Sequence, residues 1–188
     1  MSAALELAGD VLRAKGEAAH RWVVDTRRMA SLMAGVVKYD DSALVDSDIA
    51  QAQSIRDQLE QVRLHFDTGS AVVRSEDAVT IRRVAALVTK LAGLAFVAGL
   101  RLSVEVIGHA DATGSESSNV YLSAERAHMV TALVAAAETS AGAVTTAKRN
   151  SQPLFSNAGP AAENRIVRFT VRLRPEGMEP FSSRKTRT

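Results

Sequence analysis

Apolar and polar residues alternate in three stretches of the C-terminal two thirds of the chain. These stretches cover residues 61–66, 101–108 and 165–173, and every second residue in them is apolar. Such alternation predicts strands with one buried and one exposed face. A weaker strand signal covers residues 143–149.

Apolar residues recur at three- and four-residue spacing between these strands, which predicts two amphipathic helices. The first covers residues 75–99, with Ser75 as its N-cap, and the second is predicted to begin with Ser123 as its N-cap. Residues 150–164 form a long polar connection to the last strand. Strands separated by helices in this order predict an α+β fold, in which one mixed sheet is covered by helices.

The N-terminal segment predicts a smaller group of elements. Residues 5–17 have the pattern of a short hairpin that turns at Gly9–Asp10. Residues 18–34 follow with helical periodicity, and Gly35 is predicted to close that helix in a left-handed conformation. These few elements are a thin basis for an independent core.

A further strand and a connecting helix are predicted next. Residues 36–45 have a strand pattern that is interrupted by a turn at Asp40–Asp41. Asp48 is then predicted to cap a helix that runs to about Gln61. We expect this helix to join the small N-terminal group to the larger α+β unit.

Composition narrows the function classes. The chain has 188 residues, 46% of them hydrophobic, and a formal net charge of only +2, which disfavours nucleic-acid binding by the whole body. It has no cysteine, so disulfides and thiolate metal sites are excluded. No apolar run approaches the ~20 residues needed to span a bilayer, and the N-terminus lacks the basic region of a signal peptide. Residues 176–188 are predicted to form a basic, flexible tail.

The loop of residues 107–127 carries the candidate chemistry, and three interpretations compete. His109 and Asp111 could start a metal site, but such a site needs three or four ligands and no others are indicated. Ser123 could be a nucleophile with His109 as its base, yet the Gly-x-Ser-x-Gly turn that exposes such a serine is missing. Alternatively, Asp111 could accept from an ammonium while Arg126 binds a carboxylate. Spacing alone does not distinguish this zwitterion site from a simple Asp111–Arg126 ion pair.

The stretch "VEVIGHADATGSESSNVYLSAERA", residues 104–127, resembles the OmpA-like peptidoglycan-binding domain. This family includes the C-terminal domain of OmpA, the peptidoglycan-associated lipoprotein and the flagellar stator protein MotB. The upstream stretch "LHFDTGSAVV" resembles the opening strand and Phe-Asp loop of the family. The downstream stretch "ENRIVRFTV" resembles its closing Asn-Arg-Arg-Val strand. The resemblance extends over residues 61–174 and implies a β-α-β-α-β-β sandwich.

The resemblance implies a non-catalytic clamp on the diaminopimelate residue of the peptidoglycan stem peptide. Asp111 would bind the ammonium group of this residue and Arg126 would bind its carboxylate. The remaining ligand-binding positions that the resemblance implies are Phe66, Asp67 and Thr68 on one wall, Asn119 and Leu122 on the other, and Arg165 as a further donor. No catalytic residue, metal or cofactor is implied.

Two residues depart from the family pattern. Ala110 stands where the family has a threonine, and Ile166 stands where it has the second arginine of Asn-Arg-Arg. Both leave Asp111 and Arg126 in place, but both are expected to loosen the pocket. They are also the only support in the sequence for an alternative function, an OmpA-like scaffold of an envelope machine that does not bind the cell wall.

The N-terminal segment weakly resembles part of a BON module, with a small βαβ unit, although Gly9–Asp10 inverts the usual Asp-Gly order. We therefore expect a partial BON-like segment at 1–47, a linker helix at 48–60, the OmpA-like domain at 61–175 and the tail at 176–188. The resemblance places the protein in the periplasm or cell envelope, with an anchor or signal outside this chain. Membrane contact through the BON-like segment or an upstream part, and a homodimer, are compatible with this picture.

Overall fold

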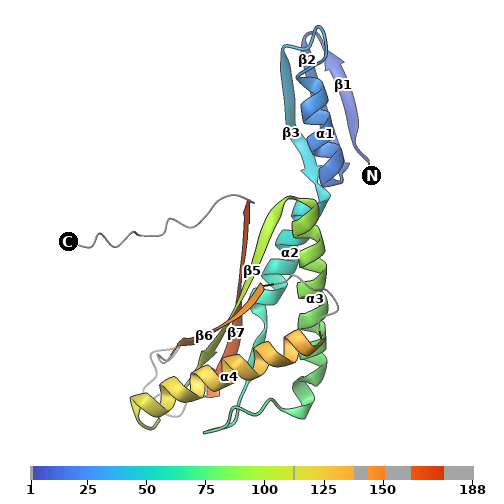
Figure 1. Ribbon diagram of the computed structural model, residues 1–188. Coiled ribbons are helices and arrows are strands. Elements are labelled where there is room, and N and C mark those ends of the chain that lie inside the picture. The colour runs from blue at the N-terminus through green and yellow to red at the C-terminus, as the bar shows by residue number, and fades with distance from the viewer. Residues whose placement is uncertain (1, 112, 138–143, 151–161, 176–188) are drawn as a thin grey trace, which may run out of the picture.

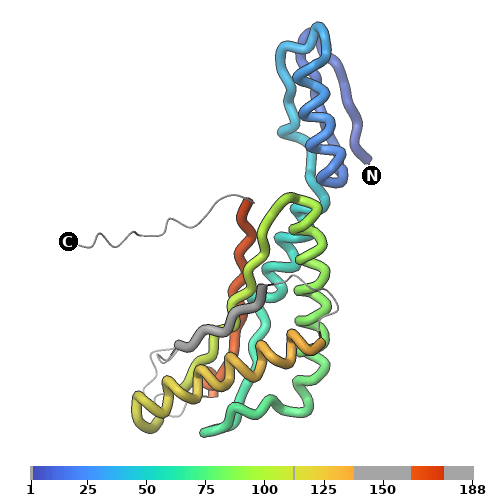
Figure 2. Tube along the Cα trace, viewed as in Figure 1, coloured from blue at the N-terminus to red at the C-terminus, as the bar shows by residue number. Residues whose placement is uncertain are grey.

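The computed structural model describes residues 2–111, 113–137, 144–150 and 162–175, and of residues 144–150 only the backbone (Figure 1). The predicted tail at 176–188 and most of the predicted polar connection therefore lie outside the described residues. Two sheets are present in the described part, one of three strands and one of four. The tube in Figure 2 follows the chain from the smaller N-terminal unit into the larger one.

The larger unit has the predicted β-α-β-α-β-β order. Its elements are α2 (Ser47–Gln61), β4 (Arg63–His65), η1 (Ser75–Asp77), α3 (Ala78–Val97), β5 (Leu100–His109), α4 (Glu116–Ala137), β6 (Val144–Asn150), η2 (Ala162–Asn164) and β7 (Ile166–Pro175). The strand order is β4-β7-β5-β6, with β5 and β6 parallel and the other pairs antiparallel. The predicted mixed sheet, including its weakest strand, is thus confirmed.

Alternation along the strands builds the core. Val104 and Val106 on β5 face the helices together with Phe169 and Val171 on β7, and all four are buried. The helix α2, which we expected to be a linker, also contributes Ala52, Ile55 and Leu59 to this core.

Both predicted serine caps are wrong. Ser75 begins the short turn η1, and α3 starts three residues later without a side-chain cap. The helix α4 starts at Glu116, because the Oγ of Ser115 accepts a hydrogen bond from the backbone N of Ser118 and thereby caps it. Ser123 lies inside α4, where its Oγ donates to the Val120 carbonyl at 2.9 Å.

The N-terminal unit consists of β1 (Ala4–Ala8), β2 (Val11–Ala18), α1 (His20–Ala30) and β3 (Lys38–Asp46). The hairpin of β1 and β2 turns at Gly9–Asp10 as predicted, with Gly9 at φ 66°. The strand β3 pairs with β2 in parallel and runs unbroken through Asp40–Asp41, so the turn predicted there is wrong. The register of the two strands shifts here, because Asp40 pairs with Arg13 but Ala43 pairs with Lys15.

Two predicted helix ends in this region also move. The helix α1 ends at Ala30, with Ser31 at its C-cap, so Gly35 adopts a positive φ in the turn after the helix and does not cap it. The cap of α2 is Asp46, whose carboxylate accepts from the backbone N of Ile49, while Asp48 accepts from the backbone N of His20. The carboxylates of Asp46 and Asp48 thus connect the start of α1 to the start of α2.

The helix α4 can lie against β5 only because residue 108 is a glycine. A Cβ at Gly108 would overlap the carbonyl group of Ser123 on α4. We predict that Gly108→Ala lowers the free energy of unfolding by about 1–3 kcal/mol through overpacking. Urea denaturation followed by circular dichroism measures this.

The matched control is Gly93→Ala in α3, where an added Cβ meets nothing within 4 Å. There the exchange is expected to raise the free energy of unfolding by about 0.5–1 kcal/mol, because alanine has the higher helix propensity. Equal effects at both positions would contradict the close α4–β5 contact.

Candidate functional site

Arg126 is the centre of the candidate site. It lies in the third turn of α4, not in the first turn as predicted, because α4 begins at Glu116. Its side chain is 0% exposed, and three of its nitrogens donate to main-chain carbonyls. Nε donates to Ser70 at 2.8 Å, Nη1 to His109 at 2.9 Å and Nη2 to Asp67 at 3.0 Å. The side chain that was expected to bind a carboxylate is therefore a buried group that joins the loop after β4 to the end of β5.

An aromatic ring and a low-polarity environment complete the surroundings of Arg126. Its guanidinium lies 5.2 Å from the centroid of the Phe66 ring, within the range of a cation–π contact. Burial lowers the pKa of Arg126 to about 10, and the positive charge of Arg165 adds to this, while the carboxylate of Asp111 opposes it. Arg126 therefore keeps its positive charge at neutral pH although it is fully buried.

Asp111 binds two partners, and neither is Arg126. Its Oδ2 accepts from Nη1 of Arg165 at 3.0 Å, and its Oδ1 accepts from the hydroxyl and the backbone N of Thr113. Burial pushes the pKa of Asp111 upward, but the hydrogen bonds from Thr113 and Arg165 outweigh it and hold this pKa below its ordinary value. Asp111 is thus an ionised, nearly buried acceptor.

Arg165 links this carboxylate to the end of β4. Its Nε donates to the Phe66 carbonyl at 3.2 Å, and its own carbonyl accepts from the backbone N of Phe66 at 2.9 Å. The side chain of Arg165 is 14% exposed and that of Asp111 is 7% exposed. The pair therefore lies at the rim of the site, while Arg126 lies beneath it.

The cluster of Arg126, Arg165 and Asp111 holds two guanidinium groups and one carboxylate. Within this cluster the formal charge is consequently one positive unit. Desolvated guanidinium groups bind carboxylates strongly and in a fixed orientation. The arrangement can thus bind an anion, and an ammonium can approach Asp111 where it retains accepting capacity.

A family comparison fits this geometry. The family model described as "OmpA family" matches residues 65–166. The chain belongs to the OmpA family. The match does not include the N-terminal segment of this OmpA-family chain. The BON-like resemblance of that segment therefore stays a prediction. No curated protein matches the chain in sequence.

Several solved structures are similar to this chain. The peptidoglycan-associated lipoprotein from Burkholderia pseudomallei is 17% identical with a TM-score of 0.48, over 58% of this chain and 89% of that chain. The C-terminal domain of Helicobacter pylori MotB is 18% identical with a TM-score of 0.46, over 62% and 86%. The cell wall anchor of the T6SS from Pseudomonas aeruginosa is 26% identical with a TM-score of 0.43, over 58% and 75%. The family assignment of this OmpA-family chain rests on the sequence match.

Five of the eight predicted site residues come together in this OmpA-family domain: Phe66, Asp67, Asp111, Arg126 and Arg165. Asp67 contributes its carbonyl, because its carboxylate pairs with Arg74 at 2.7 Å. Thr68 is exposed in the adjoining loop, and Asn119 and Leu122 are half-buried in the first two turns of α4. Sequence reasoning missed Thr113, although a threonine two residues after an aspartate is the pattern of a local Asx turn.

The two departures from the family pattern are buried apolar residues. Ala110 is 0% exposed and Ile166 is 2% exposed. Ile166 starts β7 directly after Arg165, and Ala110 directly precedes Asp111. Both departures are therefore buried next to the rim pair in sequence, and neither adds a polar group to the site.

The other interpretations of the loop gain no geometric support. The hydroxyl of Ser123 is directed to its own helix, and Nε2 of His109 accepts from Nε of Arg168 at 3.0 Å. Within the described residues, no group of three or more His, Cys, Asp or Glu side chains could hold a metal ion. In the same part of the chain no helix has both the length and the apolar character to cross a bilayer.

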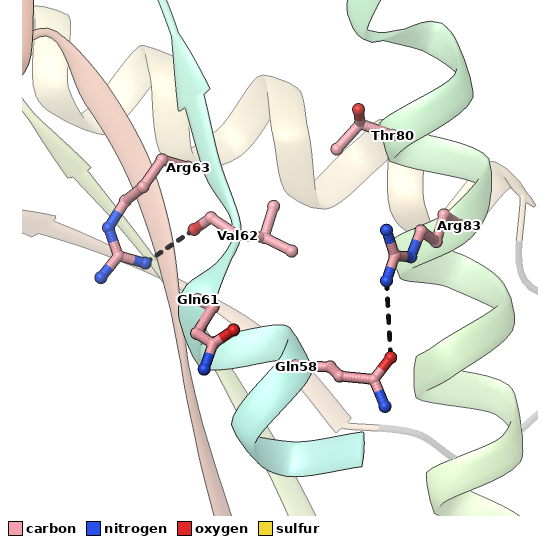
Figure 3. Close-up of a pocket in the computed structure, with 6 residues that line it drawn as sticks. All are labelled: Gln58, Gln61, Val62, Arg63, Thr80 and Arg83. Atoms are coloured by element: carbon pink, nitrogen blue, oxygen red, sulfur yellow. Dashed lines mark hydrogen bonds between the residues drawn. The ribbon is translucent and has the colours of Figure 1, made fainter. Parts of the chain in front are cut away.

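A separate cavity lies between the end of α2 and α3 (Figure 3). Its lining residues are Gln58, Gln61, Val62, Arg63, Thr80 and Arg83. The side chain of Gln58 accepts a hydrogen bond from Arg83 at 3.5 Å. Arg63 extends away from Thr80 and Arg83 in this view and donates to the Val62 carbonyl. Arg126 and Asp111 are not among its lining residues.

We predict that Arg126→Lys lowers the free energy of unfolding by about 2–4 kcal/mol, because one ammonium cannot replace the fork that satisfies three carbonyls. Chemical denaturation measures this. The control Arg82→Lys, at an exposed position of α3, is expected to stay within about 0.5 kcal/mol of the wild type. A similarly small effect at Arg126 would refute its role as the organising group.

The lowered pKa of Asp111 predicts how the stability of the fold changes with pH. Its pKa is lower in the folded chain than in the unfolded one, so its contribution is fully present above the unfolded pKa of about 3.9 and is lost as the pH falls through the folded pKa. The stability of the wild type should therefore fall more steeply below pH 4 than that of Asp111→Asn. Denaturation curves measured from about pH 6 to pH 2 test this, and parallel profiles would show that Asp111 titrates normally.

Proposed function

We propose that this OmpA-family domain binds peptidoglycan without catalysis and anchors an envelope protein to the cell wall. The proposal is supported by the convergence of Asp111, Arg126 and Arg165 in one cluster that carries excess positive charge. The names of two similar structures, a peptidoglycan-associated lipoprotein and a cell wall anchor, agree with it.

The proposed ligand group is the free end of diaminopimelate in the stem peptide. It bears an ammonium and a carboxylate on one carbon, so it needs an acceptor and a donor a few ångströms apart. Asp111 would accept from the ammonium. The carboxylate would bind the guanidinium of Arg126, two of whose five N–H groups remain beyond the three carbonyl bonds, with Arg165 as a further donor.

The proposed walls of the site come from two segments. Phe66, Asp67 and Thr68 would line one side, and Asn119 and Leu122 the other. Because Arg126 is fully buried and Asp111 nearly so, the proposal requires the loop after β5 to move away from Arg165 when the ligand enters. The ion pair between Asp111 and Arg165 is then the contact that has to open.

Binding to one stem peptide would be weak, because the ammonium of the ligand must replace hydrogen bonds that Asp111 already makes to Arg165 and Thr113. Useful anchoring would arise from many copies or from tethering, where effective concentration multiplies single contacts. This function places the protein in the periplasm, with peptidoglycan as its partner.

The alternative function is a scaffold of an envelope machine with an idle pocket. One observation favours it: Asp111 is already satisfied by Arg165 and Thr113, and Arg126 by three carbonyls. A domain of this kind would keep the cluster for its fold alone.

Calorimetry with a soluble stem peptide that contains diaminopimelate separates the two functions. We predict that Asp111→Asn weakens binding by about tenfold or more, because a charge-assisted hydrogen bond to the ammonium is lost. A peptide with lysine in place of diaminopimelate lacks the carboxylate. It should bind the wild type as weakly as the diaminopimelate peptide binds Asp111→Asn.

Asp57→Asn is the matched control, since this exposed carboxylate of α2 lies outside the cluster. It is expected to leave the affinity unchanged. Absence of any heat of binding with the folded wild type would instead favour the scaffold.

A further inference from the structure

Five arginines share the face of the larger sheet that is turned away from the helices. Side chains alternate along a strand, and Leu102, Val104 and Val171 face the helical core. The residues between them consequently face the opposite way. On the described strands this face carries Arg63 from β4, Arg101 from β5, and Arg168, Arg172 and Arg174 from β7. We call these residues the basic sheet face.

Strand register sets like charges directly opposite each other on this face. Arg63 pairs with Arg168 across β4 and β7, and Arg101 pairs with Arg174 across β5 and β7. Like charges in such positions destabilise a sheet. Among the described residues of these three strands, Glu105 is the one carboxylate, and it binds Arg172 at 2.5 Å. The basic sheet face therefore has a clear excess of positive charge.

Four of these arginines are exposed, although Arg172 binds Glu105 and Arg63 donates to the Val62 carbonyl. Arg63, Arg101, Arg172 and Arg174 are exposed, whereas Arg168 is half-buried and donates to His109. None of the exposed large apolar residues in the described part of the chain lies on this face. A surface of this kind attracts anions by charge and hydrogen bonding without inserting apolar groups.

The basic sheet face is continuous with the proposed binding site. Arg165 of the rim pair directly precedes β7, and Figure 1 shows β7 running from there to the opposite end of the sheet. The nine residue steps from Arg165 to Arg174 span about 30 Å. A polymer held at Asp111 and Arg126 could therefore pass along a row of guanidinium groups.

We propose that the basic sheet face binds carboxylates of peptidoglycan stems next to the stem that the site holds. This inference rests on the proposed function and adds a second contact with the same polymer. Peptidoglycan repeats its anionic stems along a chain, and guanidinium forks match carboxylate geometry. Each contact is weak and exposed, but several on one polymer add to the avidity.

The test compares Arg101→Gln/Arg174→Gln with the wild type on purified sacculi and on a soluble stem peptide. The substituted residues have no ion-pair partner among the described residues, so the fold should be retained. We expect about a three- to tenfold loss of sacculus affinity at about 0.01 M salt, and less than about a twofold loss at about 1 M salt, where screening is nearly complete. Affinity for the soluble peptide should stay unchanged.

The control Arg82→Gln/Lys90→Gln removes the same charge from exposed positions of α3, on the helical side of the sheet. It should retain wild-type sacculus affinity. Equal losses in both double variants would overturn the proposal, because net charge alone would then explain them. A loss on anionic phosphatidylglycerol vesicles with no loss on sacculi would also overturn it, and would assign the face to a lipid surface.

The two proposals fail separately. If the wild type does not bind the soluble stem peptide, the Asp111–Arg126 site is refuted. A salt-sensitive sacculus affinity that depends on Arg101 and Arg174 would persist in that case. If the stem peptide binds and the Arg101/Arg174 variant matches the wild type on sacculi at low salt, only the basic sheet face is refuted.

Discussion

A single buried guanidinium holds the functional end of this domain together. Arg126 donates to carbonyls of the loop after β4 and to the carbonyl at the end of β5, so it fixes two segments that are far apart in sequence. Burying a charge without partners is costly, and the lowered pKa of about 10 reflects that cost. Three carbonyl dipoles, the Phe66 ring and the nearby Asp111 carboxylate offset it. Arg126 consequently holds the loop after β4 and the end of β5 together in the absence of a ligand.

This arrangement would let one residue serve both the fold and the proposed recognition of a ligand. Carbonyl oxygens satisfy part of the guanidinium fork but add no formal negative charge. Asp111 is paired with Arg165, so the formal charge of the cluster remains one positive unit. A carboxylate is the ligand group that balances such a site.

The local sequence pattern was sufficient to predict the sheet but not the geometry of the site. Alternation identified the strands, and the family motif identified Asp111 and Arg126. The start of α4 was predicted too late, since residues 116–119 are all polar and Ser123 resembles a cap as closely as Ser115 does. The arginine partner of Asp111 lies 54 residues away and could not follow from spacing. Burial of Arg126 depends on loops that close over it, and no periodicity encodes this.

The placement of the proposed site would suit an anchor that bears mechanical load. The N-terminal unit joins the domain at Asp46, where the carboxylate contacts His20 and caps α2. The strand β5 ends at the opposite end of the larger unit, and Asp111 follows it (Figure 1). In the proposed function, a pull between the bound cell wall and the N-terminal unit would pass through α2 and the core that it shares with β5 and β7. These strands pair over nine successive residues, with hydrogen bonds perpendicular to their axis, so many bonds would share that load at once.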